Sequence, residues 1–418
     1  MEQYKIKGGR RIEGSIDACG SKNAALPILA ASILTGEECL IERCPAISDV
    51  NKMKYIIESI GGRIKEEDGG LLVDSSFLGS TEVPRELMQS MRSSVFMAGP
   101  LISRLGRAEI YRPGGCRIGM RPIDMHISVF EAFGAKIRSE DEKIVCEAPP
   151  GGLKGAEIKL PFPSVGATEN AVCTAVLAEG NTVICGAACE PEIEDLATFL
   201  KSCGAEIEGA GSSVIKIKGV KRLSGTRHKV ISDRIEGGTL MLAAAVTRGS
   251  LFLRGGVFAH MESFLMALSL CGCSVTVYND GIEVKAQNRL SSLEKLATAP
   301  HPGFPTDMQP QMMAALATAD GESRIEENIF ENRFGAAKEL NKMGAHIEIY
   351  GKNAIIKGVR CLEGKDTEAS DLRGGAALVI AALAAEGESN VGGIKHIERG
   401  YSGLDERLRS LGADIERT

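Results

Sequence analysis

Apolar and polar positions along the chain follow one pattern that recurs several times. Each copy begins with an Ala-rich apolar run of helical length, such as residues 376–385, which predicts a buried helix because no polar face interrupts it. A glycine follows each run and predicts a left-handed C-terminal cap; these glycines are Gly36, Gly106, Gly180, Gly249, Gly321 and Gly387. A short β-type run comes next, for example residues 251–253. Each copy therefore starts as a buried helix leading into a strand.

The second half of each copy predicts an amphipathic helix and then hairpin-like segments. In the last copy, Leu404, Leu408 and Leu411 are spaced to share one helical face. The helix ends at a signature of glycine, a small residue, any residue, and Ile or Val. Its glycines recur every 68–73 residues, at Gly61, Gly134, Gly204, Gly272, Gly344 and Gly412. A fixed period of this kind indicates a repeated structural unit.

Six units of about 70 residues account for almost the whole chain. Three of these units begin with nearly the same amino-acid sequence, at residues 6–14, 217–225 and 356–364. A unit that contains both helices and strands predicts the α/β class. Three such units can close around their apolar helices, so we expect two globular domains of three repeats each.

The composition of the chain argues against several classes of function. The 418 residues carry 49 Lys and Arg against 55 Asp and Glu, a net charge of −6, which argues against a general nucleic-acid or membrane-surface binder. Aromatic content is 4% with no Trp, so base-stacking platforms are not expected. The N-terminus lacks the apolar run of a signal peptide, and no apolar stretch is long enough for a bilayer. We expect a soluble, cytoplasmic protein.

Common cofactor and metal motifs are missing from the sequence. Its twelve cysteines form no CxxC pair, and its six histidines show no HxH or HxxxH spacing. Neither GxxxxGK[ST] nor a GxGxxG in βαβ context is present. We therefore expect reduced core thiols, no metal and no cofactor.

Cationic residues lie where the buried helices are predicted to begin. These starts fall near Lys22–Asn23, Arg92, Val165–Gly166, Asp233–Arg234, Thr306–Asp307 and Asp371–Arg373. If the inner helices of a domain run parallel, their positive ends converge and favour an anion. Lys and Arg at such ends oppose the helix dipole, which favours a ligand that carries the negative charge. The alternative is solvated surface cations.

Arginines also recur at matching points of the outer helices. Arg121 and Arg399 each precede a signature glycine by 13 residues, and Arg333 precedes one by 11. Arginine holds carboxylate and phosphate groups through two parallel hydrogen bonds. A small ligand bearing both groups would suit this layout.

Residues 111–122 break the repeat with a Gly- and Pro-rich loop around Cys116. Arg117 and Arg121 nearby favour the thiolate and make Cys116 a candidate proton donor or nucleophile. The alternative is an incidental cysteine in a turn. Asp307, which follows a Pro-rich approach, is open to two interpretations: an ordinary N-cap or a catalytic base.

Together these residues resemble the UDP-N-acetylglucosamine 1-carboxyvinyltransferase family of enolpyruvyl transferases. The motifs cover the whole chain and lie at 20–27, 113–122, 164–168, 233–236, 300–307, 330–334, 371–373 and 399–401. The resemblance implies an inside-out α/β barrel of two domains, each with three βαβαββ repeats. One domain would span residues 22–230, and the other residues 1–21 plus 231–418. Ser48 and Phe162 stand where some relatives carry basic residues.

The resemblance also implies an activity. The enolpyruvyl group of phosphoenolpyruvate would pass to the 3′-hydroxyl of UDP-N-acetylglucosamine through a tetrahedral ketal, with release of phosphate, as the first committed step of peptidoglycan synthesis. Cys116 would be the general acid and the site of a covalent adduct, including one with the inhibitor fosfomycin. Asp307 would be the base, and Lys22, Arg121 and Arg399 would hold the phosphoenolpyruvate anion beside Asn23. Further substrate contacts implied are Arg92, Pro122, Ile123, Asp124, Met125, Ser164, Val165, Ile329, Arg333, Asp371 and Arg373.

Two other functions stay open from the sequence. A 5-enolpyruvylshikimate-3-phosphate synthase shares the six-unit fold, although its opening motif ends in Lys-Ser, where this chain has Lys22-Asn23, and it lacks the Cys loop. A catalytically silent regulatory paralogue would need none of the candidate catalytic residues, all of which are present here. Phosphate release that depends on one acceptor, on the other, or on neither distinguishes the three.

Overall fold

The computed structural model describes residues 2–67, 69–114, 119 and 123–418. Their contacts divide the chain into two compact units. Unit 1 contains the described residues up to Cys19 together with Ser232–Thr418, and unit 2 contains residues 20–114 and 123–231. The first strands of the chain therefore belong with its C-terminal half.

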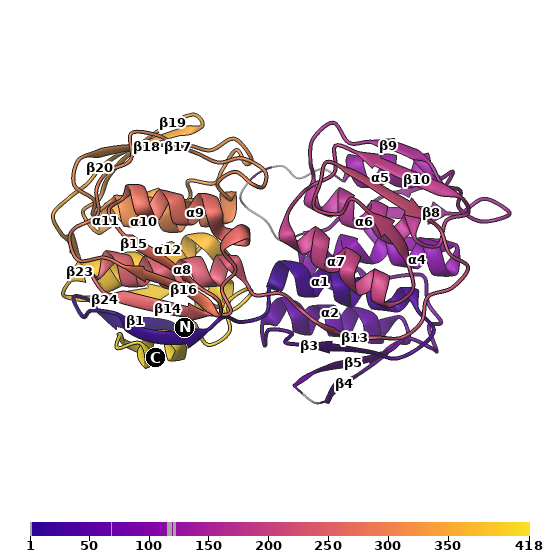
Figure 1. The fold of residues 1–418 in the computed structure, drawn as a ribbon, viewed down its shortest axis with the longest axis horizontal. Coiled ribbons are helices and arrows are strands. Elements are labelled where there is room, and N and C mark those ends of the chain that lie inside the picture. Colours follow the sequence, from indigo (N-terminus) through magenta and orange to yellow (C-terminus); the bar gives the residue numbers. More distant parts are fainter. Residues whose placement is uncertain (1, 68, 115–118, 120–122) are drawn as a thin grey trace. The chain divides into compact units, whose positions relative to one another are not determined.

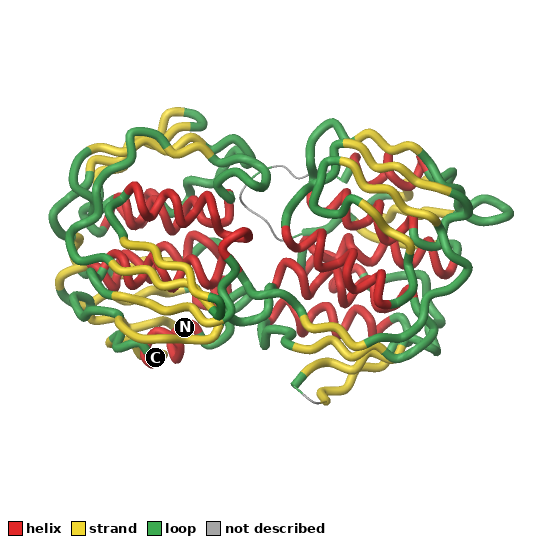
Figure 2. Tube along the Cα trace, in the orientation of Figure 1, coloured by secondary structure: helices red, strands yellow, loops and turns green. Residues whose placement is uncertain are grey.

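Each unit has apolar helices at its centre and sheets around them (Figures 1 and 2). In unit 1 the central helices are α8 (Arg234–Val246), α10 (Gln309–Leu316) and α12 (Leu372–Ala384). In unit 2 they are α1 (Lys22–Ala31), α4 (Ala98–Leu105) and α6 (Val165–Ala175). Helix α12 is buried without interruption from Arg373 to Leu383, as expected for a helix that is apolar all round. The predicted inside-out α/β architecture is confirmed.

The helix starts are also confirmed. Helix α4 is preceded by the 3₁₀ helix η2 (Arg92–Met97), and α10 by η3 (Thr306–Met308). The amphipathic outer helices are α2 (Ser48–Ser59), α5 (Asp124–Ala132), α7 (Pro191–Ser202), α9 (Phe258–Leu270), α11 (Ala337–Lys342) and α14 (Leu404–Ser410). Short helical segments complete the set at η1 (Ser32–Leu34), α3 (Arg85–Ser90) and α13 (Ile394–Ile397).

Three four-stranded sheets surround the helices of unit 1. Their strand orders are β22-β24-β1-β25, β15-β16-β14-β2 and β17-β18-β20-β19. The strands are β1 (Gln3–Lys7), β2 (Glu13–Asp17), β14 (Ser250–Arg254), β15 (Ser274–Tyr278), β16 (Gly281–Lys285), β17 (Leu296–Ala297), β18 (Glu322–Glu326), β19 (His346–Tyr350), β20 (Asn353–Lys357), β22 (Asp366–Glu368), β24 (Glu388–Gly392) and β25 (Asp414–Arg417). A further parallel pair joins β21 (Leu362–Glu363) to β23 (Ala385–Glu386). Strand β1 pairs antiparallel with both β24 and β25, which ties the start of the chain to its end.

Unit 2 repeats the arrangement with the orders β13-β3-β5-β4, β6-β8-β7 and β11-β12-β10-β9. The strands are β3 (Cys39–Glu42), β4 (Arg63–Glu67), β5 (Gly70–Asp74), β6 (Arg107–Tyr111), β7 (Lys136–Glu140), β8 (Lys143–Glu147), β9 (Glu157–Lys159), β10 (Asn181–Cys185), β11 (Glu206–Glu208), β12 (Val214–Lys218) and β13 (Arg227–Lys229). The last copy runs β9-α6-β10-α7-β11-β12, which is the expected βαβαββ unit. The parallel partner in each four-stranded sheet sits at one edge.

The glycines that follow the outer helices are all left-handed, whereas those that follow the inner helices are left-handed only in part. All six signature glycines that end the outer helices adopt φ between 87° and 103°. Of the six after the inner helices, Gly36 and Gly249 are not left-handed, so the prediction is wrong there. Arg248 takes the left-handed conformation instead, with φ 57°. Gly249 is required for space, since a Cβ there would lie 1.9 Å from the carbonyl oxygen of Ile12.

Helix length also bears on membrane topology. The longest helices in the described part of the chain, α8, α9 and α12, have 13 residues each. None of the described helices is long and apolar enough to cross a membrane.

Candidate functional site

Asp307 lies between two buried arginines in unit 1. Its two carboxylate oxygens accept hydrogen bonds from Arg333 Nη2 at 2.7 Å and from Arg373 Nη2 at 3.0 Å. Both arginine side chains are 3% exposed, whereas that of Asp307 is 29% exposed. Arg333 Nε also donates to the carbonyl oxygen of Thr306 at 3.1 Å. The solvated-surface interpretation is therefore wrong for Arg373, and Arg333 is buried as well.

Arg373 is held from several sides yet keeps unused donors. Its guanidinium lies over the ring of Tyr401, 5.4 Å from the ring centre. Burial works to lower the pKa of Arg373, but Asp307, Tyr401 and Asp233 outweigh it and hold the pKa above its usual value. Its Nε and Nη1 are buried and have no hydrogen-bond partner among the described residues. Buried donors of this kind are normally paired, so the hydrogen bonding of this cation is incomplete at these two nitrogens.

Asp371 and Asp233 differ from Asp307 because each of them caps a helix. Asp371 caps α12 by accepting from the backbone N–H groups of Arg373 and Gly374, and Asp233 caps α8 in the same way. Asp307 does not cap a helix: the N-cap residue of η3 is Pro305, and no side-chain cap bond is made. The capping interpretation of Asp307 is wrong because its carboxylate faces the arginines instead.

Ile329 and Arg399 lie on two loops of unit 1. Glu327, 2% exposed, accepts hydrogen bonds from the backbone N–H of Ile329 and from the hydroxyl of Thr306, the residue before Asp307. Arg399 is half-buried in the turn after α13, two residues beyond Ile397, which packs against Gly375 at the start of α12. Glu327 thus fixes one of these loops beside Asp307.

Lys22 begins helix α1 in unit 2 and is almost buried. Its Nζ lies 2.8 Å from Asp49 Oδ2, and the two side chains are 10% and 1% exposed. Lys52 Nζ lies 3.6 Å from the other oxygen of Asp49. Asn23, next in α1, is half-buried. A cation at the N-terminus of a helix is unfavourable, so Asp49 supplies the opposite charge that keeps Lys22 in place.

The remaining unit 2 candidates lie at the first turns of η2, α5 and α6. Arg92 begins η2, Val165 begins α6, and Ser164 caps α6 by accepting from Ala167 N. Asn170 of α6 hydrogen-bonds to His126 of α5 at 2.8 Å and to Val95 O of η2 at 3.1 Å. Ile123, Asp124 and Met125, at the start of α5, are buried, exposed and half-buried, respectively. These bonds bring the three helices together within unit 2.

Three of the predicted residues, Cys116, Arg121 and Pro122, lie outside the described residues. Several residues that contact the candidates or their neighbours were not singled out from the sequence, among them Asp49, Glu327 and Gln311, and neither was Glu169 of α6. Gln311 donates to the hydroxyl of Tyr401 at 3.2 Å. Asp49 follows Ile47-Ser48 at the start of an amphipathic helix, where acidic residues are common, so its spacing carried no signal.

Glu169 of α6 is a carboxyl group buried inside unit 2. It is 1% exposed, and neither carboxyl oxygen has a hydrogen-bond partner among the described residues. Burial, reinforced by Glu192 and Glu190, raises the pKa of Glu169 well above its usual value. The folded state therefore favours the protonated form.

This predicts a pH dependence of the stability of unit 2. Because the folded pKa is raised, the contribution is complete below the unfolded pKa of about 4.3 and is lost as pH rises through the folded pKa. Glu169→Gln, which cannot ionise, should therefore lose less stability between pH 5 and pH 8. The difference in slope should reach up to about 1.4 kcal/mol per pH unit in urea unfolding. Glu208→Gln, at an exposed glutamate of β11, is the control. Equal slopes for wild type and Glu169→Gln would contradict the prediction.

Known proteins match this chain over nearly its whole length. The family model of EPSP synthase (3-phosphoshikimate 1-carboxyvinyltransferase) matches residues 6–408. A UDP-N-acetylglucosamine 1-carboxyvinyltransferase 2 from Carboxydothermus hydrogenoformans is 47% identical, with 100% of this chain and 99% of the relative covered. A UDP-N-acetylglucosamine 1-carboxyvinyltransferase from Finegoldia magna is 45% identical, with the same coverage.

Solved structures give the same fold. The enolpyruvyl transferase NikO from Streptomyces tendae matches with a TM-score of 0.90 at 26% identity, covering 100% of this chain and 99% of that one. An EPSP synthase from Acinetobacter baumannii matches with a TM-score of 0.78 at 18% identity over the full length of both chains, which supports the fold alone. The family includes EPSP synthases and UDP-N-acetylglucosamine 1-carboxyvinyltransferases. The full-length identity of 45–47% to members of the second group decides between these two branches. The chain belongs to the enolpyruvyl transferase family and, within it, to the UDP-N-acetylglucosamine 1-carboxyvinyltransferases.

Proposed function

We propose that this protein transfers the enolpyruvyl group of phosphoenolpyruvate to the 3′-hydroxyl of UDP-N-acetylglucosamine and releases phosphate. The reaction would be the first committed step of peptidoglycan synthesis and would take place in the cytoplasm. The observation that carries the proposal is the 44–47% identity, over the full chain, to relatives that bear this name. The 5-enolpyruvylshikimate-3-phosphate synthase alternative shares the fold but lacks support at this level of identity.

The cationic residues of the site suit the anionic substrate. We assign Lys22, Arg121 and Arg399 to the carboxylate and phosphate of phosphoenolpyruvate, with Asn23 beside them. Lys22 is supported by its near burial against Asp49, which leaves an ammonium group whose charge is only weakly screened by water. The positive charge of Arg373, which lies beside the partly exposed Asp307, supports a second contact with substrate charge.

Asp307 and Cys116 would move the protons. In the addition step, Asp307 takes the proton of the 3′-hydroxyl, the sugar oxygen bonds to C2 of phosphoenolpyruvate, and Cys116 gives a proton to C3. In the elimination step, the Cys116 thiolate takes a proton back from C3, the C2–O bond to phosphate breaks, and the double bond is restored. The protonated Asp307 gives its proton to the departing phosphate. Arg333 and Arg373 position Asp307 by holding both of its oxygens.

The nucleotide sugar would be bound by the starts of the unit 2 helices. These contacts are Arg92, the stretch from Arg121 to Met125, Ser164 and Val165, together with Ile329 of unit 1. Ser164 is half-buried and is used as a cap, so its backbone and not its hydroxyl is the better candidate contact. Arg333, Asp371 and Arg373 complete the ionic lining.

A turnover assay tests the proposal. Phosphate release from phosphoenolpyruvate is measured with UDP-N-acetylglucosamine, with shikimate 3-phosphate, and with no acceptor. We expect release only with the nucleotide sugar, and covalent modification of Cys116 by fosfomycin. Release only with shikimate 3-phosphate would establish the sister activity, and release with neither would indicate a silent paralogue.

A further inference from the structure

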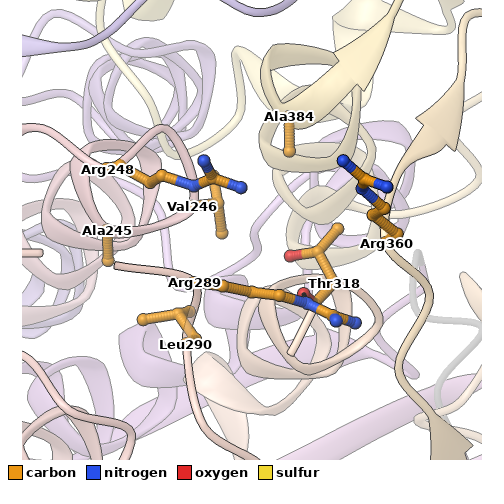
Figure 3. Close-up of a pocket in the computed structure, with 8 residues that line it drawn as sticks. All are labelled: Ala245, Val246, Arg248, Arg289, Leu290, Thr318, Arg360 and Ala384. Atoms are coloured by element: carbon orange, nitrogen blue, oxygen red, sulfur yellow. Dashed lines mark hydrogen bonds between the residues drawn. The ribbon is translucent and has the colours of Figure 1, made fainter. Parts of the chain in front are cut away.

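A small pocket opens at the end of unit 1 where the inner helices finish. It encloses about 50 Å³ and is lined by Ala245 and Val246 of α8, by Thr318 just after α10, and by Ala384 of α12. Arg248, Arg289 and Arg360 complete the lining with Leu290. Figure 3 shows the three guanidinium groups approaching the pocket from different sides. Because Asp307 and Arg373 lie at the opposite, N-terminal ends of α10 and α12, this pocket is separate from the candidate active site.

The C-terminal ends of helices carry partial negative charge and would normally repel an anion. Arg289 reduces this repulsion at the end of α10 by pairing with carbonyl groups of the turn that follows the helix. It donates hydrogen bonds to the carbonyl oxygens of Thr318, Ala319, Gly358 and Val359, and its Nη1 lies 3.2 Å from the carboxylate of Asp320. The carbonyl groups at this helix end are thereby paired and screened from the pocket.

Arg248 and Arg360 do not pair with carbonyl groups of the described residues in the way that Arg289 does. Arg248 and Arg360 are exposed, and neither makes a hydrogen bond or ion pair through its guanidinium with any described residue. None of the eight lining residues carries a carboxylate. Two positive charges therefore face one pocket without a counter-charge in the described part of the chain.

Two backbone features lie at or next to these arginines. Arg248 adopts φ 57°, a conformation that residues other than glycine rarely take. Arg360 comes two residues after Gly358, where a Cβ would come within 1.9 Å of the carbonyl oxygen of Ala319, in the turn after α10. The left-handed conformation of Arg248 ends α8, since the backbone N–H groups of Arg248 and Gly249 donate to the carbonyl oxygens of Ala245 and Ala244.

The size of the pocket limits the ligand. A buried water molecule needs about 10–15 Å³ of cavity volume, so the pocket has room for about three to five water molecules. This leaves room for one tetrahedral oxyanion inside the pocket.

We propose that this pocket binds a phosphate-sized oxyanion between Arg248 and Arg360, and that the bound ion links the ends of α8, α10 and α12. The ion stabilises the folded unit 1 because it binds the folded state and neutralises two like charges. The proposal does not depend on the proposed enzymatic activity.

Thermal unfolding in inorganic phosphate tests this proposal at fixed pH and ionic strength. In wild type, a concentration twenty times Kd should raise Tm by about 3–5 °C. Arg360→Gln should lose at least half of this rise. Lys338→Gln, which removes an exposed cation of α11 away from the pocket, should keep it. Sulfate should act like phosphate, whereas acetate should not.

Arg248→Gly separates binding from folding. Glycine adopts the left-handed conformation freely, so this variant should have a Tm without phosphate at least equal to that of wild type. Its response to phosphate should nevertheless fall by at least half. An unchanged phosphate response in both Arg248→Gly and Arg360→Gln, or an equal response to acetate in wild type, would overturn the proposal.

Discussion

Asp307→Asn should lower kcat by at least about two orders of magnitude, because an amide cannot take the proton of the sugar hydroxyl. The substitution changes one atom type and leaves the side-chain shape almost unaltered. The Kd for UDP-N-acetylglucosamine, measured by calorimetry, should change much less than kcat. Such a split places the effect on the chemical step.

The same substitution should also reduce stability. Arg333 and Arg373 would both face a neutral amide, and its NH₂ group cannot accept from the second arginine. We expect a loss of about 1–3 kcal/mol in the free energy of unfolding. Activity must therefore be measured well below the lowered Tm and expressed per folded molecule.

Asp280→Asn is the matched control, since Asp280 is exposed in the turn between β15 and β16. It should keep both the kcat and the Tm of wild type. If Asp307→Asn loses stability as expected but turns over within a few-fold of wild type, Asp307 positions the arginines and is not the base.

Cys116→Ala should lower kcat by about 10²–10⁴-fold, the usual contribution of a general acid. Cys116→Asp keeps a proton donor and should turn over, yet it offers no sulfur and should resist fosfomycin. Steady-state rates and peptide mapping after fosfomycin treatment check both variants. Full activity in Cys116→Ala would remove the residue from the mechanism.

The other cysteines make this labelling selective. Burial raises the pKa of Cys19, Cys44, Cys146 and Cys271 to about 12, which disfavours the reactive thiolate. A hydrogen bond with Cys203 lowers the pKa of Cys39 to about 7, but Cys39 has no exposed surface.

Cys185 is half-buried and serves as the matched control. Cys185→Ala should keep full turnover and the fosfomycin label on Cys116. A first label on Cys185 would contradict the assignment of Cys116 as the most reactive thiol.

Much of the architecture was determined by the sequence alone. The starts of the inner helices at Lys22, Arg92, Val165 and Arg234 were predicted because apolar length and polar flanking residues are local properties of the chain. The glycines that end the outer helices were predicted for the same reason, since each occupies a left-handed position that its own helix end requires. Six copies of one local pattern then indicated the repeated fold.

The tertiary structure alone decided how the polar groups are paired. Asp307 could be a helix cap or a charged partner from its neighbours in sequence, and its arginines come from 26 and 66 residues away. The burial of Glu169, the pairing of Lys22 with Asp49, and the arginine pocket at the end of α10 likewise depend on which helices pack together. Hydrogen bonds and burial between distant segments follow from the close packing of the whole unit, which no local pattern encodes.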